Sequence, residues 1–120
     1  KDKNLCQKED RILDIGPKTI VKFIKIIQKS SSVIFNGPLG FIEKAPYNIG
    51  SVAIASEVAN VKKRGGISVI GGGETIQIFN LIKKQKKVTY ISTGGGAMLT
   101  YLSQKELPAI KALKQNSFEI

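Results

Sequence analysis

Three short apolar runs, each followed within three residues by glycine, constrain the fold of this 120-residue chain more than any other feature. Short runs rich in β-branched residues that stop at turn-forming residues are typical of strands. We therefore predict three strands, each of which leads into a glycine-containing loop. The strands cover residues 32–35 (SVIF), 67–70 (ISVI) and 88–91 (VTYI).

In the stretches around these strands, apolar residues recur at helical spacing. Pro17 suits the first turn of a helix, and Ile20, Ile24 and Ile27 recur at helical spacing between lysines. Gly65 is a typical stop for a helix that begins near residue 49. In all, we predict helices over residues 17–30, 49–63, 75–83, 97–102 and 108–114.

The alternation of strands and helices predicts an α/β fold, a three-layer α/β/α arrangement with a mostly parallel, Rossmann-like sheet. The strands are almost continuously apolar, as expected when both faces of a sheet are covered. We assign residues 1–11 to an irregular lead-in, 12–114 to one partial nucleotide-binding domain and 115–120 to a tail. Ligands of such sheets bind at the carboxyl ends of the strands, where the glycines lie here.

Composition excludes several classes of protein. With one cysteine, Cys6, and no histidine, the chain has neither a disulfide framework nor the commonest zinc ligand. No apolar run approaches the roughly twenty residues that cross a bilayer, and the first ten residues lack the apolar core of a secretory signal. We expect no membrane partner and a cytoplasmic location.

The net charge of +10 would attract polyanions, including nucleic acid. The lysines fall mainly in predicted helices, at residues 18, 22, 25 and 29 and over residues 83–87, where they would form solvated faces. No RNA-reading or helix-turn-helix motif accompanies them. We expect no dedicated nucleic-acid partner, and a basic nucleic-acid-binding protein remains an alternative.

Two triple-glycine runs, residues 71–73 and 94–96, each stand between a predicted strand and a predicted helix. Glycine there lets backbone N–H groups approach an anion, and a helix N-terminus adds partial positive charge. A tight turn alone would explain one run, but two in equivalent places indicate a shared phosphate site. Neither run matches the P-loop or the dinucleotide fingerprint.

Acidic residues near these loops could complete a nucleotide site. Glu74 could hold Mg²⁺ against phosphates and the Thr75 hydroxyl could donate to them. A first-turn acid also stabilises a helix without any ligand. Glu43, beyond the loop at residues 36–40, could accept hydrogen bonds from a ribose, although a loop glutamate is often only solvated.

As an ordered set, these motifs resemble phosphoglycerate kinase, specifically the later part of its C-terminal, nucleotide-binding domain. The resemblance covers roughly residues 12–114. It rests on residues 13–19 (LDIGPKT), 35–40 (FNGPLG) with Glu43, 69–73 (VIGGG), 92–97 (STGGGA) and 105–108 (KELP).

The resemblance implies phosphoryl transfer between 1,3-bisphosphoglycerate and ADP, giving 3-phosphoglycerate and ATP in glycolysis, with Mg²⁺ on the nucleotide. It implies that Glu43 binds the ribose, that Glu74 binds the metal and that Thr75 lies near the phosphates. It also implies roles for two further groups: Leu13, Asn36 and Pro38 would form the nucleotide pocket, and Gly72, Gly73, Gly94, Gly95 and Gly96 would present amides to the transferred phosphoryl group.

This sequence departs from the family pattern at three positions. It has Glu74 where the family usually has Asp, Ile12 where Gly is frequent and Tyr90 where His is frequent. The substrate-binding N-terminal domain and a segment with an active-site lysine have no counterpart in these residues. We therefore expect a partial chain that is inactive alone and monomeric in its full-length form, or alternatively a non-catalytic nucleotide-binding module.

Overall fold

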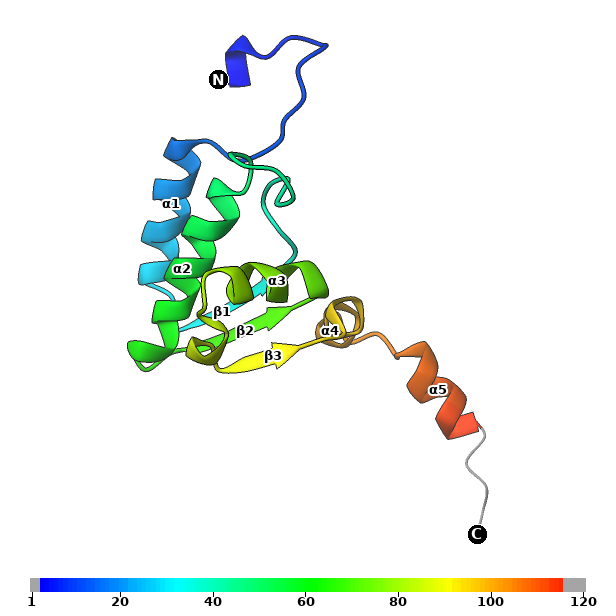
Figure 1. Ribbon diagram of the computed structural model, residues 1–120. Coiled ribbons are helices and arrows are strands. Elements are labelled where there is room, and N and C mark those ends of the chain that lie inside the picture. Colours follow the sequence, from blue (N-terminus) through cyan, green and yellow to red (C-terminus); the bar gives the residue numbers. More distant parts are fainter. Residues whose placement is uncertain (1–2, 116–120) are drawn as a thin grey trace.

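A computed structural model describes residues 3–115 and shows three strands alternating with helices (Figure 1). The element order is the one that the strand and glycine pattern predicts. In chain order the elements are the 3-10 turn η1 (Lys3–Leu5), α1 (Pro17–Gln28), β1 (Ser32–Asn36), α2 (Ile49–Lys63), β2 (Ile67–Gly71), α3 (Gly73–Leu81), the 3-10 turn η2 (Gln85–Lys87), β3 (Tyr90–Ser92), α4 (Gly95–Leu102) and α5 (Pro108–Gln115).

The strands form one parallel sheet in the order β1-β2-β3. Phe35 lies opposite Ile70, and Ile70 lies opposite Ile91. Parallel neighbours need a crossover, which α2 supplies between β1 and β2, and which α3 and η2 supply between β2 and β3. The predicted α/β fold with a parallel sheet is confirmed, and all three strands end at the same edge.

The hydrophobic core lies between one face of the sheet and the helices α1, α2 and α3. Its central residues are Phe79 of α3, Ile70 of β2 and Val58 of α2, all fully buried. The rings of Phe35 and Phe79 meet edge to face, with centroids 6.2 Å apart. This packing fixes α3, and therefore its N-terminus, relative to the ends of β1 and β2.

The opposite face of the sheet is largely open within the described residues. Ile34, Ile67 and Tyr90 lie on this face and are exposed. The almost continuously apolar strands led us to predict that both faces of the sheet are covered. Residues 3–115 instead bury mainly the face that carries Phe35 and Ile70.

Several element boundaries differ from the predicted ones by one or two residues, and two of these differences have a clear local cause. The helix expected from Thr75 begins at Gly73, because Gly72, with φ +88°, turns the chain directly after β2. The strand expected from Val88 begins at Tyr90. Just before it, Thr89 N–H donates to the Ser68 carbonyl at 2.9 Å and Thr89 Oγ1 accepts from Ser68 N–H at 3.0 Å, so a side chain replaces part of the regular ladder.

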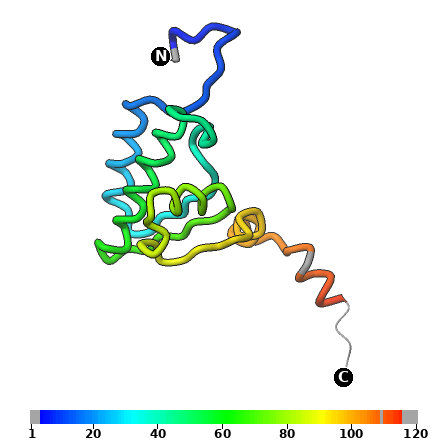
Figure 2. The backbone as a smooth tube through the Cα atoms, viewed as in Figure 1, coloured from blue at the N-terminus to red at the C-terminus, as the bar shows by residue number. Residues whose placement is uncertain are grey.

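The ends of the described chain extend away from the sheet, as the tube view shows (Figure 2). Residues 3–11 contain only η1, and α5 leads away from the sheet beyond α4. The predicted tail begins at the last residue of α5, and residues 116–120 lie outside the described residues. Over residues 3–115, no helix is both long and apolar enough to cross a bilayer.

Candidate functional site

The carboxyl ends of the three strands surround a cavity of about 330 Å³. Both triple-glycine runs reach it, so the two bends that the sequence places 23 residues apart lie at one rim of the sheet. The cavity is lined by Asn36, Gly37, Gly72, Gly73, Glu74, Thr75, Thr93, Gly95 and Gly96.

The N-termini of α3 and α4 both open onto this cavity. The first backbone N–H groups of a helix have no partner within it. Within residues 3–115, no acceptor binds the N–H groups of residues 73–75 of α3 or 95–97 of α4. Five of these six residues line the cavity. Such a paired arrangement of free donors and helix dipoles favours an anion.

Asn36, at the end of β1, holds an unpartnered oxygen beside both glycine runs. Its Oδ1 is buried and is the one such side-chain atom without a hydrogen bond in the described part of the chain. A β-carbon built on Gly95 would lie 2.5 Å from this oxygen and 2.7 Å from Gly72 N. Only glycine therefore allows the start of α4 to approach Gly72 this closely.

Thr75 joins two walls of the cavity. Its side chain is fully buried, and its Oγ1 accepts a hydrogen bond from Gly37 N–H at 2.7 Å. The sequence predicted a hydroxyl that donates to phosphates; in the structure its oxygen is already an acceptor for the loop after β1. The bond spans 38 residues of sequence. Thr75 thus holds that loop against the N-terminus of α3.

A second cavity, of about 320 Å³, lies between the segment before α1 and the loop after β1. Two predicted nucleotide residues, Leu13 and Pro38, line this cavity and not the first one. Phe41 N–H donates to the Leu13 carbonyl at 2.8 Å and joins its walls. The complete lining is Ile12, Leu13, Asp14, Ile15, Pro38, Leu39, Gly40 and Phe41.

The predicted site residues are therefore divided between two cavities that share the loop of residues 36–41. Gly94 is the N-cap of α4 and lines neither cavity. Glu43 is exposed in a turn and lines neither. Thr93 and Asp14 line a cavity and were not predicted as site residues. Thr93 could have been found from its place directly before the second glycine run.

Glu74 is the acidic residue of the first cavity. Its side chain is exposed, in the first turn of α3. No group of three or more Cys, Asp or Glu residues that could hold a metal occurs among the described residues. A cation at Glu74 would therefore need further oxygen ligands from a bound molecule, which is the usual mode for Mg²⁺ in sites that bind nucleotide phosphates.

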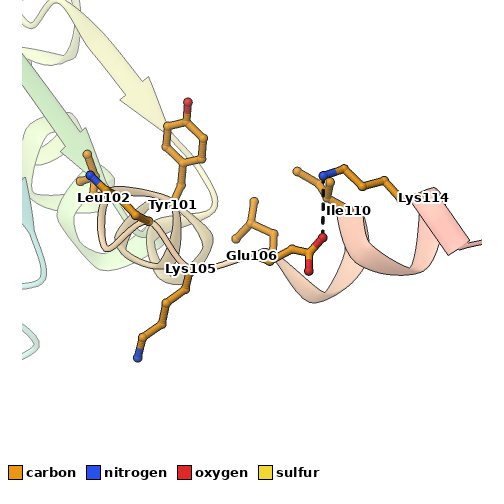
Figure 3. Close-up of a pocket in the computed structure, with 8 residues that line it drawn as sticks. Tyr101, Leu102, Lys105, Glu106, Ile110 and Lys114 are labelled. Atoms are coloured by element: carbon orange, nitrogen blue, oxygen red, sulfur yellow. Dashed lines mark ion pairs between the residues drawn. The ribbon is translucent and has the colours of Figure 1, made fainter.

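A further hollow, of about 680 Å³, lies between α4 and α5 and contains no glycine loop (Figure 3). Tyr101, Leu102 and Ile110 contribute to its wall. Lys114 Nζ lies 3.7 Å from Glu106 Oε1 across one end. These side chains are exposed, and the hollow has none of the free helix N-termini that line the first cavity.

The comparisons with known proteins agree on one family. A sequence model described as "Phosphoglycerate kinase" matches residues 1–105. The phosphoglycerate kinase of Maridesulfovibrio salexigens is 40% identical over 97% of this chain and 29% of its own length. That of Buchnera aphidicola is 41% identical over 92% of this chain and 28% of its own length. The chain thus spans less than a third of these relatives.

Solved structures give the same result. The structure of phosphoglycerate kinase from Coxiella burnetii matches with a TM-score of 0.78 and 32% identity, over 96% of this chain and 29% of that one. The enzyme from Pyrococcus horikoshii matches with a TM-score of 0.71 and 37% identity, over 88% of this chain and 25% of that one.

Proposed function

Because this chain belongs to the phosphoglycerate kinase family, we propose that it forms the part of such a kinase that binds the nucleotide and the transferred phosphoryl group. The observation that carries the proposal is the convergence of two free helix N-termini on the 330 Å³ cavity. Free N–H groups there suit phosphate oxygens, and a phosphoryl group in transfer needs such donors on its equatorial oxygens. The cavity lined by Leu13 and Pro38 is proposed to take the adenine end of ADP or ATP.

Each group in the first cavity has a defined role in this proposal. The N–H groups of Gly73 and Gly96 donate to the phosphates, since a β-carbon at either residue would meet nothing within 4 Å and the backbone is therefore accessible. The Asn36 side chain lines the same cavity, where its NH₂ group can donate to a phosphate oxygen, whereas its buried, unpartnered Oδ1 can only accept. The roles of Gly72 and Gly95 are to bring the two loops together, and Gly94, outside the cavity, is the N-cap of α4.

Glu74 fits a magnesium-bound nucleotide. It is one accessible carboxylate beside a cluster of phosphate donors, and Mg²⁺ in such sites takes one or two carboxylates while the phosphates and water complete its shell. When bound, Mg²⁺ would neutralise charge on the phosphates. Glu74 would anchor the ion, and the donors of α3 and α4 would orient the phosphates.

The complete reaction is proposed to be the reversible transfer between 1,3-bisphosphoglycerate and ADP that gives 3-phosphoglycerate and ATP. The site for the glycerate and the remaining catalytic groups would come from polypeptide beyond these residues. The open sheet face around Ile34 and Ile67 supports an arrangement in which further chain covers it. We propose a monomeric, cytoplasmic full-length protein, with Glu43 reaching the ribose once the nucleotide is bound.

A mixing assay tests the proposal. The chain and a separately expressed N-terminal part of a relative are combined, and ATP formation from 1,3-bisphosphoglycerate and ADP is followed. We expect turnover only when both pieces are present, because phosphoryl transfer requires both substrates to be positioned together. Nucleotide binding without turnover, with both pieces folded and the glycerate bound, would instead support a non-catalytic binding module.

The charge of +10 supports a second candidate, a nucleic-acid-binding protein. Binding to DNA or RNA would weaken steeply with salt and would not depend on the glycine loops. A competition experiment distinguishes the two candidates. If the chain does not bind ADP, and magnesium-bound ADP does not displace a bound oligonucleotide, the results would favour a nucleic-acid-binding protein.

Replacing Glu74 with glutamine is expected to weaken the Mg²⁺ dependence of nucleotide binding. The amide keeps the size of the side chain but loses the charge that attracts the cation. The ADP dissociation constant at saturating Mg²⁺ should rise about tenfold, or about 1.4 kcal/mol, while binding without Mg²⁺ stays unchanged. Titration calorimetry with and without Mg²⁺ measures both values, and an equal effect in the two conditions would exclude Glu74 as the metal ligand.

A further inference from the structure

The two walls of the second cavity are attached to consecutive residues in the first turn of α2. On one wall, Asp14 Oδ2 accepts from Gly50 N–H at 2.8 Å. On the other, Leu39 N–H donates to Ser51 Oγ at 2.9 Å. Both walls are irregular chain between elements, residues 12–15 before α1 and 38–41 after β1. Their spacing therefore depends on these attachments and on the bond from Phe41 to Leu13.

Asp14 is closely enclosed at this junction. Its Oδ1 accepts from Ile15 N–H at 2.8 Å, so both carboxylate oxygens bind backbone donors. A β-carbon on Gly40 would lie 2.5 Å from Oδ1, and one on Gly50 would also collide with it. A carboxylate at the first turn of a helix is favoured by the helix dipole. The position of this carboxylate is thus fixed from three sides.

Ser51 is equally constrained. It is fully buried at 0% exposure, in the first turn of the 15-residue helix α2. Its partner is Leu39 N–H, in the wall that leads from β1 to the cavity. The bond is part-buried, and a donor that loses its partner in such a place destabilises the local structure, so the position of the loop depends on Ser51.

We propose that Asp14 and Ser51 are positioning residues that set the width of the cavity for the base of the nucleotide, while the phosphate cavity is held separately by the bond from Gly37 N–H to Thr75 Oγ1. This inference rests on the proposed function, which assigns the second cavity to the adenine end. It predicts that the two ends of the nucleotide site can be weakened independently. The base end responds to the first turn of α2, and the phosphate end does not.

The test compares ADP with tripolyphosphate, a probe that has phosphates and no base, using calorimetry on the full chain. In Asp14→Asn the amide keeps the shape of the side chain, but its NH₂ group faces one of the two N–H donors and cannot accept. We expect ADP affinity to fall about tenfold and tripolyphosphate affinity to stay unchanged. Ser51→Ala should give the same pattern from the other wall.

Asp10→Asn is the matched control, because Asp10 undergoes the same chemical change in an exposed segment that lines neither cavity. It should bind both probes as the unaltered chain does. Equal losses of affinity for ADP and tripolyphosphate in Asp14→Asn and Ser51→Ala, or no loss of ADP affinity, would contradict this inference. Neither result would contradict the proposed function. An unaltered chain that binds neither probe would overturn the proposed function and this inference together.

Discussion

Replacing Gly95 with alanine is expected to remove most of the affinity of this chain for magnesium-bound ADP. The added β-carbon would lie 2.5 Å from Asn36 Oδ1 and 2.7 to 2.8 Å from Gly72 N and Cα. Two of these three contacts are backbone, so α4 must move away from α3. A misplacement of about 1 Å in such a site can cost about a hundredfold in function, and we expect a loss of that order in the ADP association constant.

Gly16→Ala is the control for this change. Gly16 precedes α1, has φ −80°, and a β-carbon there would meet nothing within 4 Å. The control should bind ADP normally. Calorimetry on both variants, with circular dichroism to confirm the helices, separates loss of the site from loss of the fold. Unchanged ADP binding by folded Gly95→Ala would show that the close approach of the two glycine loops is not required.

Replacing Phe79 with alanine is expected to lower the free energy of unfolding by about 3 to 5 kcal/mol, the usual cost of removing a buried aromatic side chain. Phe79 is fully buried and packs against Phe35, so the change leaves a cavity between α3 and the sheet. A typical domain has only about 5 to 15 kcal/mol of stability, so this is a large fraction. Urea unfolding followed by circular dichroism measures the difference.

Leu81 provides the comparison for Phe79, since it belongs to the same helix and is 65% exposed. Leu81→Ala should change the unfolding free energy by less than about 0.5 kcal/mol, as expected for an exposed position. Similar effects of the two substitutions would contradict the assignment of the core to the face of the sheet that α3 covers.

The order of the elements could be predicted because strand and helix periods are local properties of the sequence. Runs such as residues 67–70 indicate a strand, and the glycines that follow mark where it ends. The boundaries were harder because they depend on backbone angles and side-chain bonds. The positive φ of Gly72 allowed α3 to begin at Gly73, and the Ser68 and Thr89 bonds shortened β3.

The sequence placed the two glycine runs and Glu74 at one edge of the sheet, and most of these residues line one cavity, while their roles stay predictions. The division into two cavities was not predictable, because it depends on contacts between residues far apart in the chain. Asp14 and Gly50 are 36 residues apart, and Thr75 and Gly37 are 38 apart. No periodic pattern encodes such bonds. For Asp14, the available signal was its place in the quoted motif at residues 13–19, which offered no role for its carboxylate.

Nuclear magnetic resonance of the backbone amides during titration with magnesium-bound ADP is the most direct test of the central claim, that two helix N-termini bind the phosphates together. We expect the amide signals of residues 73–75 and 95–97 to shift in parallel with one dissociation constant, and tripolyphosphate to shift the same signals. Shifts confined to one of these two groups, or to the lysines of α1, would contradict it.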